Sequence, residues 1–174
     1  EVGRLAGHPA ELHGRPLPDA VARRVDVLVP TVPAIVLGST QPDVDHDRAA
    51  ADGLAVVRRR SGGGAVLVAP DDPLWVDVDL PADAPLWDDD VGRSFLWLGR
   101  AWAEVLRGHG LAATVHEGPF DPGPWGRQVC FAGRGPGEVF VDGGKAVGIA
   151  QRRTRAGARF QCAVPARWDP APLV

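Results

Sequence analysis

The 174-residue sequence contains two cysteines, a single lysine, no methionine and no tyrosine. Two cysteines cannot form the disulfide framework of a small secreted domain, and no Cys/His cluster has the spacing of metal ligands, so we expect no metal site. The sequence also lacks an apolar run of roughly eighteen residues and a charged, then apolar, leader. We therefore expect no membrane association and a cytoplasmic location.

Positive charge is not in excess. Nineteen basic residues against 22 acidic residues give a formal net charge of −3 and a pI near 5.9. The arginines are dispersed except in 58–60 and 152–155, so we expect no nucleic-acid partner. The composition, 45% hydrophobic, favours one domain over residues 1–174 that buries about 70% of its unfolded surface. Because the chain begins at Glu1 and ends abruptly, we expect one or both termini to be incomplete.

The hydrophobic pattern predicts an α+β fold with a mixed, mostly antiparallel sheet packed against helices. Strand 65–68 is expected to pair with strand 74–80, where Asp77 and Asp79 would share the solvent-facing side. The first sixteen residues show no clear period and are expected to wrap the surface. Strands are predicted at 34–37, 54–57, 65–68, 74–80, 111–116 and 160–164, with a hairpin over 138–153, and helices at 18–30, 43–52 and 88–108.

A cationic, glycine-rich segment lies between two predicted strands. Three arginines (58–60) precede Ser61 and three glycines (62–64), and apolar residues flank both sides. Glycines expose backbone N–H groups to a ligand, and guanidinium groups supply charge and forked donors suited to phosphate or carboxylate. The segment predicts an anion site, and a glycine-rich hairpin with solvated arginines remains the alternative.

The hairpin 138–153 turns at Asp-Gly-Gly and carries Lys145, while the other eighteen basic residues are all arginine. A compact ammonium group and a planar guanidinium group are not equivalent at a tight site. Lys145 is therefore a candidate for chemistry, although a chance position on a turn is the alternative.

Together the two motifs resemble the lipoate-protein ligase A family, whose larger group includes biotin protein ligases and octanoyltransferases. The resemblance covers roughly residues 33–164. The family's Arg-Arg-x-x-Gly-Gly-Gly-x-Val-x-His motif is matched by Arg58, Arg59, Gly62, Gly63, Gly64 and Val66, and its Gly-x-Lys-x-x-Gly-x-Ala-Gln-Arg motif by Gly143, Lys145, Gly148, Ala150, Gln151 and Arg152. Two family histidines are missing, because Val68 ends the first motif and Cys162 replaces the histidine of a Gln-His-Gly motif.

The resemblance implies a biotin/lipoate protein ligase-like catalytic domain. Such a ligase uses ATP with Mg²⁺ to convert lipoate or octanoate to an acyl-adenylate. It then attaches the acyl group to a lysine of a lipoyl domain, in 2-oxoacid dehydrogenases or in glycine cleavage H protein. A separate accessory domain is possible, and Gln41 is placed near the acyl pocket. The expected substrate- and ATP-binding residues are Arg59, Ser61, Gly62, Gly63, Gly64, Ala65, Val66, Leu67, Gly148, Ala150 and Gln151, with Lys145 as the catalytic residue and Val66, Val68 and Val147 along the acyl tail.

Two alternatives stay open. In an ATP-independent octanoyltransferase, Cys130 would carry the acyl group as a thioester, supported by Lys145. Against this, a lone cysteine between Val129 and Phe131 is commonly inert core. The second alternative is a homologue that binds the acyl-adenylate without turnover, which the two missing histidines favour and the retained Lys145 opposes.

Overall fold

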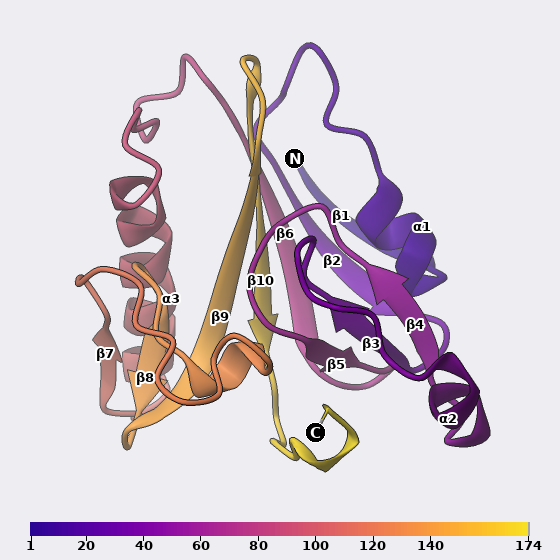
Figure 1. Cartoon of the computed structure of the whole chain (residues 1–174). Helices are drawn as coiled ribbons and strands as arrows, with labels where there is room; N and C mark the ends of the chain where they lie inside the picture. Colours follow the sequence, from indigo (N-terminus) through magenta and orange to yellow (C-terminus); the bar gives the residue numbers. More distant parts are fainter. Residues whose placement is uncertain (174) are drawn as a thin grey trace.

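The computed structural model describes residues 1–173 and contains two sheets with few helices (Figure 1). The larger sheet has seven strands in the order β1-β2-β6-β10-β9-β8-β7. β1 and β2 pair in parallel, and every other pair in this sheet is antiparallel. The predicted α+β class with a mixed, mostly antiparallel sheet is therefore confirmed. The strands are β1 (Val2–Gly7), β2 (Arg24–Pro30), β6 (Leu74–Pro81), β7 (Ala113–Val115), β8 (Val139–Val141), β9 (Gly144–Arg153) and β10 (Gly157–Val164).

The smaller sheet has the order β4-β3-β5 and is formed by β3 (Ala34–Leu37), β4 (Ala55–Arg58) and β5 (Val66–Val68). All four residues of β3 are buried, as its short continuous apolar run predicts. β5 pairs with β3, so the predicted pairing with β6 is wrong. β6 already has β2 on one edge and β10 on the other, which leaves no edge for β5.

Helix α3 (Leu96–Gly108) packs on one side of the large sheet, and the small sheet lies on the other side (Figure 1). The α3 side holds the main core, in which the rings of Phe95 and Trp97 meet Phe160 edge-on at 5.8 and 5.6 Å. The helix predicted over 88–108 begins only at Leu96, and Val91 before it and Val105 within it are more than half exposed. The other helices are α1 (Pro9–Gly14) and α2 (His46–Ala51), with 3-10 turns at Arg93–Phe95, Cys130–Ala132 and Ala171–Leu173.

The predicted helix over 18–30 is wrong, since residues 24–30 form β2. The signal for a strand is the alternation of Val25, Val27 and Val29, three β-branched residues at a period of two. The expectation that residues 1–16 only wrap the surface is also wrong. They form β1, which pairs with β2, and α1, whose capping box joins His8 and Glu11.

The predicted solvent exposure of Asp77 and Asp79 is wrong, because these side chains are 2% and 9% exposed. Arg159 binds both carboxylate oxygens of Asp79 at 2.7 and 2.8 Å, and Arg15 from the end of α1 pairs with Asp77. Burial raises the pKa of Asp77 to about 6, against the opposing effect of Arg15. The Arg15–Asp77 pair joins the end of α1 to β6, and the Arg159–Asp79 pair joins β10 to β6.

None of the helices described within residues 1–173 is both long and apolar enough to cross a membrane.

Candidate active site

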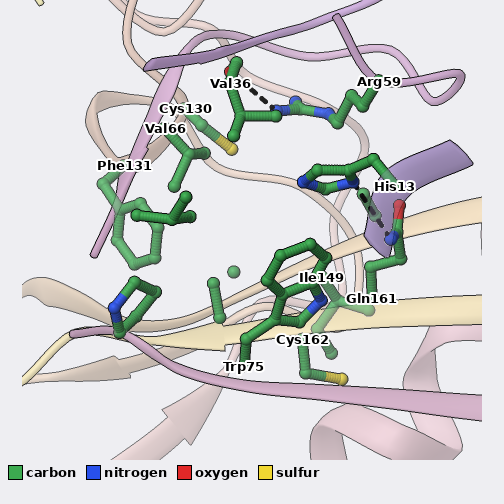
Figure 2. Close-up of a pocket in the computed structure, with 15 residues that line it drawn as sticks. His13, Val36, Arg59, Val66, Trp75, Cys130, Phe131, Ile149, Gln161 and Cys162 are labelled. Atoms are coloured by element: carbon green, nitrogen blue, oxygen red, sulfur yellow. Dashed lines mark hydrogen bonds between the residues drawn. The ribbon is translucent and has the colours of Figure 1, made fainter. Parts of the chain in front are cut away.

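Two adjoining cavities lie between the two sheets, and Figure 2 shows the inner one. The inner cavity, of about 50 Å³, has mostly apolar walls. The outer cleft, of about 510 Å³, is bounded by the glycine loop and the lysine hairpin. Arg59, Cys130, Ile149 and Ala150 line both spaces and so mark their junction. The inner cavity is lined in addition by His13, Val36, Val66, Val68, Pro73, Trp75, Phe131, Gly148, Gln161, Cys162 and Ala163.

Arg59 is a buried cation at this junction, only 5% exposed. It donates to the carbonyl oxygens of Gly62 and Gly64 at 2.8 and 2.9 Å and to that of Val36 at 3.4 Å. Burial lowers the pKa of the guanidinium group, with a partly offsetting contact to Cys130. Within residues 1–173 no carboxylate lies within salt-bridge distance of Arg59. Such a cation favours the entry of an anion.

The loop that follows Arg59 presents unused donors to the outer cleft. The N–H groups of residues 61–64 donate no hydrogen bond to any part of the described chain. The buried hydroxyl of Ser61 likewise has no partner there. Gly63 has a φ of +100°, and a Cβ at Gly38 would overlap the Gly63 carbonyl oxygen, so the loop depends on glycine at both positions. These groups form a concave donor surface of the kind that binds phosphate.

Lys145 is the second residue of β9 and lines the outer cleft, with a side chain only 2% exposed. Its ammonium group donates to the Cys130 carbonyl oxygen at 2.6 Å and lies 2.7 Å from a carboxylate oxygen of Glu138. Glu138 also accepts a hydrogen bond from the N–H of Gly135. Burial raises the pKa of Glu138, and Lys145 opposes this. The Asp142-Gly143 turn, with φ of 50° and 80°, confirms the predicted hairpin.

The two cysteines differ in their surroundings. Cys130 is half-buried and lines both cavities, with its sulfur directed into the inner one (Figure 2). Cys162 is fully buried, and burial raises the pKa of its thiol to about 12. Cys162 is therefore core, and Cys130 is the thiol that faces the cavities.

Most of the predicted site residues come together around these spaces. Gly148 lines the inner cavity and Ala150 lines both, while Gln151 lines the cleft and donates to Ser94 at 3.2 Å. Gln41 also lines the cleft and accepts a hydrogen bond from the N–H of Gly38.

Three predicted positions face elsewhere. Ala65 and Leu67 pack on the opposite side of the small sheet, where Ala65 meets Ile35, and the N–H of Ala65 already donates to Gln128. Their neighbour Val66 does line the inner cavity, because side chains alternate along a strand. Val147 lies in the main core with no exposed surface, so its predicted place along the acyl tail is wrong.

Two residues of the site were not found from the sequence. Glu138 was predicted only as the start of a hairpin, and in the structure its carboxylate pairs with Lys145 of the same hairpin. His13 lay in a segment without recognisable pattern, yet its ring lines the inner cavity. Burial, followed by the nearby charges of Arg59 and Arg15, lowers the pKa of His13 to about 3. Its imidazole is therefore neutral.

The arrangement combines an apolar chamber with an electropositive cleft through a shared junction. An acid with an apolar chain can place the chain inside and its carboxylate near Arg59 and Lys145. A phosphate can meet the N–H groups of residues 61–64 in the cleft. Chemistry that joins a carboxylate to a phosphate suits this geometry.

Residues 21–174 match the family model of the lipoyl protein ligase A/B catalytic domain. Comparison with curated protein sequences gives no match.

Solved structures share the fold at low sequence identity. Lipoate-protein ligase A bound with ATP has a TM-score of 0.71 and 20% identity, over 99% of this chain and 68% of that one. The lipoate ligase-like protein Ta0514 of T. acidophilum with bound lipoic acid has a TM-score of 0.67 and 21% identity, over 87% and 57%. A bi-partite lipoate protein ligase with its E2 lipoyl domain, from Thermoplasma acidophilum, has a TM-score of 0.70 and 20% identity, over 99% and 63%. This chain thus spans between 57% and 68% of the length of these three structures.

Proposed function

Because this chain belongs to the lipoyl protein ligase A/B catalytic-domain family, we propose that it attaches lipoate or octanoate to a lysine of a lipoyl domain through an acyl-adenylate. In this reaction the inner cavity is the acyl chamber, and the outer cleft is the nucleotide site. The chain spans only part of the length of its structural relatives, so the complete reaction is a proposal for this chain.

The observation that carries the proposal is a buried charge without a counter-charge beside N–H groups that donate to no part of the described chain. Arg59 is a buried cation without a carboxylate partner in residues 1–173, and the N–H groups of residues 61–64 are unused in the same part of the chain. Ser61 and Gly64 are buried, and buried donors without partners are costly, so the set favours a bound anion. An adenylate supplies one, since it places a phosphate beside an acyl carbonyl group.

In the first step, a carboxylate oxygen of the acid attacks the α-phosphorus of ATP, and the bond to pyrophosphate breaks. Charge develops on the phosphate oxygens, where Arg59 and the loop N–H groups supply preorganised donors. ATP would arrive with Mg²⁺. The one carboxylate of the described lining of the cleft, Glu138, is held by Lys145 and Gly135, so phosphate oxygens and water would supply the ligands of the ion.

In the second step, the amine of the acceptor lysine attacks the acyl carbonyl carbon, an amide forms, and AMP leaves with the bonding electron pair. The proton of the attacking amine leaves with solvent. Lys145 is held at the junction by Glu138 and by the Cys130 carbonyl, so its ammonium group can stabilise charge on the acyl oxygen without first losing a hydration shell. This explains why arginine does not occupy the position.

The partner is proposed to be a lipoyl domain of a 2-oxoacid dehydrogenase or glycine cleavage H protein. A bi-partite ligase among the structural relatives supports the further proposal that an accessory domain on a separate chain takes part.

The test is acid-dependent release of pyrophosphate from ATP by the full chain, followed by the mass of a lipoyl domain. We expect release with lipoate or octanoate and none without acid. Arg59→Lys should remove most of it, whereas Arg58→Lys serves as the matched control, because Arg58 contacts the carbonyl oxygens of Gly38 and Gln41 instead of lining a cavity. No release from a folded protein, with or without an added accessory domain, would contradict the proposal.

A second candidate is the ATP-independent octanoyltransferase, favoured by the position of the Cys130 sulfur inside the acyl chamber and beside Arg59. There the thiolate would attack an octanoyl thioester, the donor thiol would leave, and the acceptor lysine would then release Cys130. We favour the ligase for two reasons. Lys145 contacts the carbonyl oxygen of Cys130 and not its thiol. Only the adenylate route uses the phosphate donors of the loop. A non-catalytic binder would hold the same ligands without either reaction.

A further inference from the structure

The inner cavity contains a polar group that the proposed reaction does not use. His13, from the last turn of α1, directs its ring into the cavity (Figure 2). Its Nδ1 lies 3.3 Å from the Gln161 amide nitrogen. Its Nε2 is buried and has no hydrogen-bond partner in the described chain. Most other side chains around this space are apolar, so the unpaired nitrogen requires an explanation.

The hydrogen bond to Gln161 fixes the tautomer of the ring. An amide nitrogen only donates, so Nδ1 must accept. The imidazole is neutral, because burial and the charges of Arg15 and Arg59 oppose its protonation. The single ring proton therefore lies on Nε2, and the group that faces the cavity is a hydrogen-bond donor.

The ring is held in place on several sides. It stacks on Trp75 with ring centroids 4.2 Å apart. The turn that carries it is fixed by Arg15, which pairs with Asp26 and Asp77, and by Arg152 and Arg159, which both donate to the Arg15 carbonyl oxygen. A donor fixed in this way keeps its direction when a ligand enters.

His13 lies in the inner cavity and not in the outer cleft. Val68 and Cys162, the positions where the two motif histidines are missing, line the same space. His13 itself precedes the part of the chain that matches the family model, residues 21–174. His13 is the one imidazole among the described residues that line this space.

We propose that His13 determines the specificity of the inner cavity, donating a hydrogen bond from Nε2 to an oxygen atom carried on the chain of the acid substrate. This inference rests on the proposed function, since it takes the inner cavity as the acyl chamber. A plain alkyl chain would cover the N–H group and leave it without an acceptor. Burial of an unpaired donor costs free energy, so such a chain should bind more weakly. The preferred substrates are therefore acids with an oxo or similar acceptor group.

The test compares octanoate with a series of mono-oxo octanoates by calorimetry on the full chain. We expect one oxo acid to bind wild type about five- to tenfold more tightly than octanoate, the gain of one neutral hydrogen bond. His13→Phe keeps an aromatic ring against Trp75 but removes the N–H group, so the ratio of affinities should fall to about one. His13→Gln restores a terminal N–H and should regain part of the ratio. His46→Phe, at an exposed histidine, should keep the wild-type ratio.

Two results would overturn the inference while leaving the proposed function intact. One is wild-type binding in which octanoate equals or exceeds every oxo acid. The other is an oxo preference that His13→Phe retains. Failure of wild type to bind any of these acids would overturn the inference and the acyl chamber together, and absent pyrophosphate release would accompany it.

Discussion

The ammonium group of Lys145 lies 2.7 Å from the carboxylate of Glu138, and both side chains are less than a tenth exposed. The pair joins the only lysine of the sequence to a carboxylate that lines the outer cleft. Loss of either partner of a buried ion pair destabilises the fold, because the remaining charge is buried away from solvent.

Lys145→Met is expected to destabilise the fold, because it leaves Glu138 buried without its cation. The cost should be about 3–5 kcal/mol at neutral pH. Adding Glu138→Gln should recover most of it, since the amide needs no counter-charge. Urea unfolding of the two single variants and the double variant measures the coupling. Additive effects would show that the two groups do not depend on one another.

Lys145→Arg is expected to keep the positive charge and lower acyl transfer by about a hundred- to a thousandfold, the loss typical of one misplaced preorganised donor. The wide guanidinium group cannot occupy the ammonium position between Glu138 and the Cys130 carbonyl. Turnover on a lipoyl domain measures the effect, with circular dichroism as the check on folding. Wild-type transfer by a folded variant would mean that charge alone suffices.

Gly63→Val should weaken binding of an acyl-sulfamoyl adenosine strongly, because the loop would no longer present its N–H groups. Gly63 has a φ of +100°, and a Cβ there would meet a guanidinium nitrogen of Arg59 at 2.9 Å. The same strain should lower stability by about 1–3 kcal/mol. Gly62→Ala is the matched control for stability, because its Cβ would meet no heavy atom within 4 Å. Calorimetry and thermal unfolding separate the two effects; unchanged affinity in Gly63→Val would place the anion elsewhere.

Cys130→Ser separates the two candidate enzymes. A ligase should keep lipoate-dependent pyrophosphate release and modify a lipoyl domain at close to the wild-type rate. A transferase should stop, since an unactivated hydroxyl does not replace a thiolate. Intact mass after incubation with octanoyl carrier protein tests this directly. An ATP-independent acyl adduct on wild-type Cys130 that disappears in the variant would overturn the preference for the ligase.

Asp77 is expected to make the free energy of unfolding fall as the pH rises from 3.8 to about 6, because its folded-state pKa is raised above the ordinary value. Below this window both states hold the proton, and the contribution is fully present. Within it, the folded state binds the proton more tightly, so stability is lost. Asp77→Asn should flatten this part of the profile relative to wild type. Asp71→Asn, at an exposed position, should leave it unchanged.

Sequence alone determined the features that depend on neighbouring residues. The buried strand Ala34–Leu37 and the hairpin around Lys145 follow from short apolar runs and turn residues. The anion site at Arg59 was predicted because glycine and arginine have few equivalents where backbone must meet an anion. The anion site stays a prediction, and the N–H groups of residues 61–64 have no partner within residues 1–173.

Tertiary structure alone decided which distant segments meet. β5 joins β3 because β6 has no free edge, and this turns Ala65 and Leu67 away from the cavity. α1 carries His13 into the inner cavity, where its ring meets Gln161, a residue 148 positions away in sequence. Periodicity reports which side of an element is apolar, but the partner that covers it is set by packing across the whole chain.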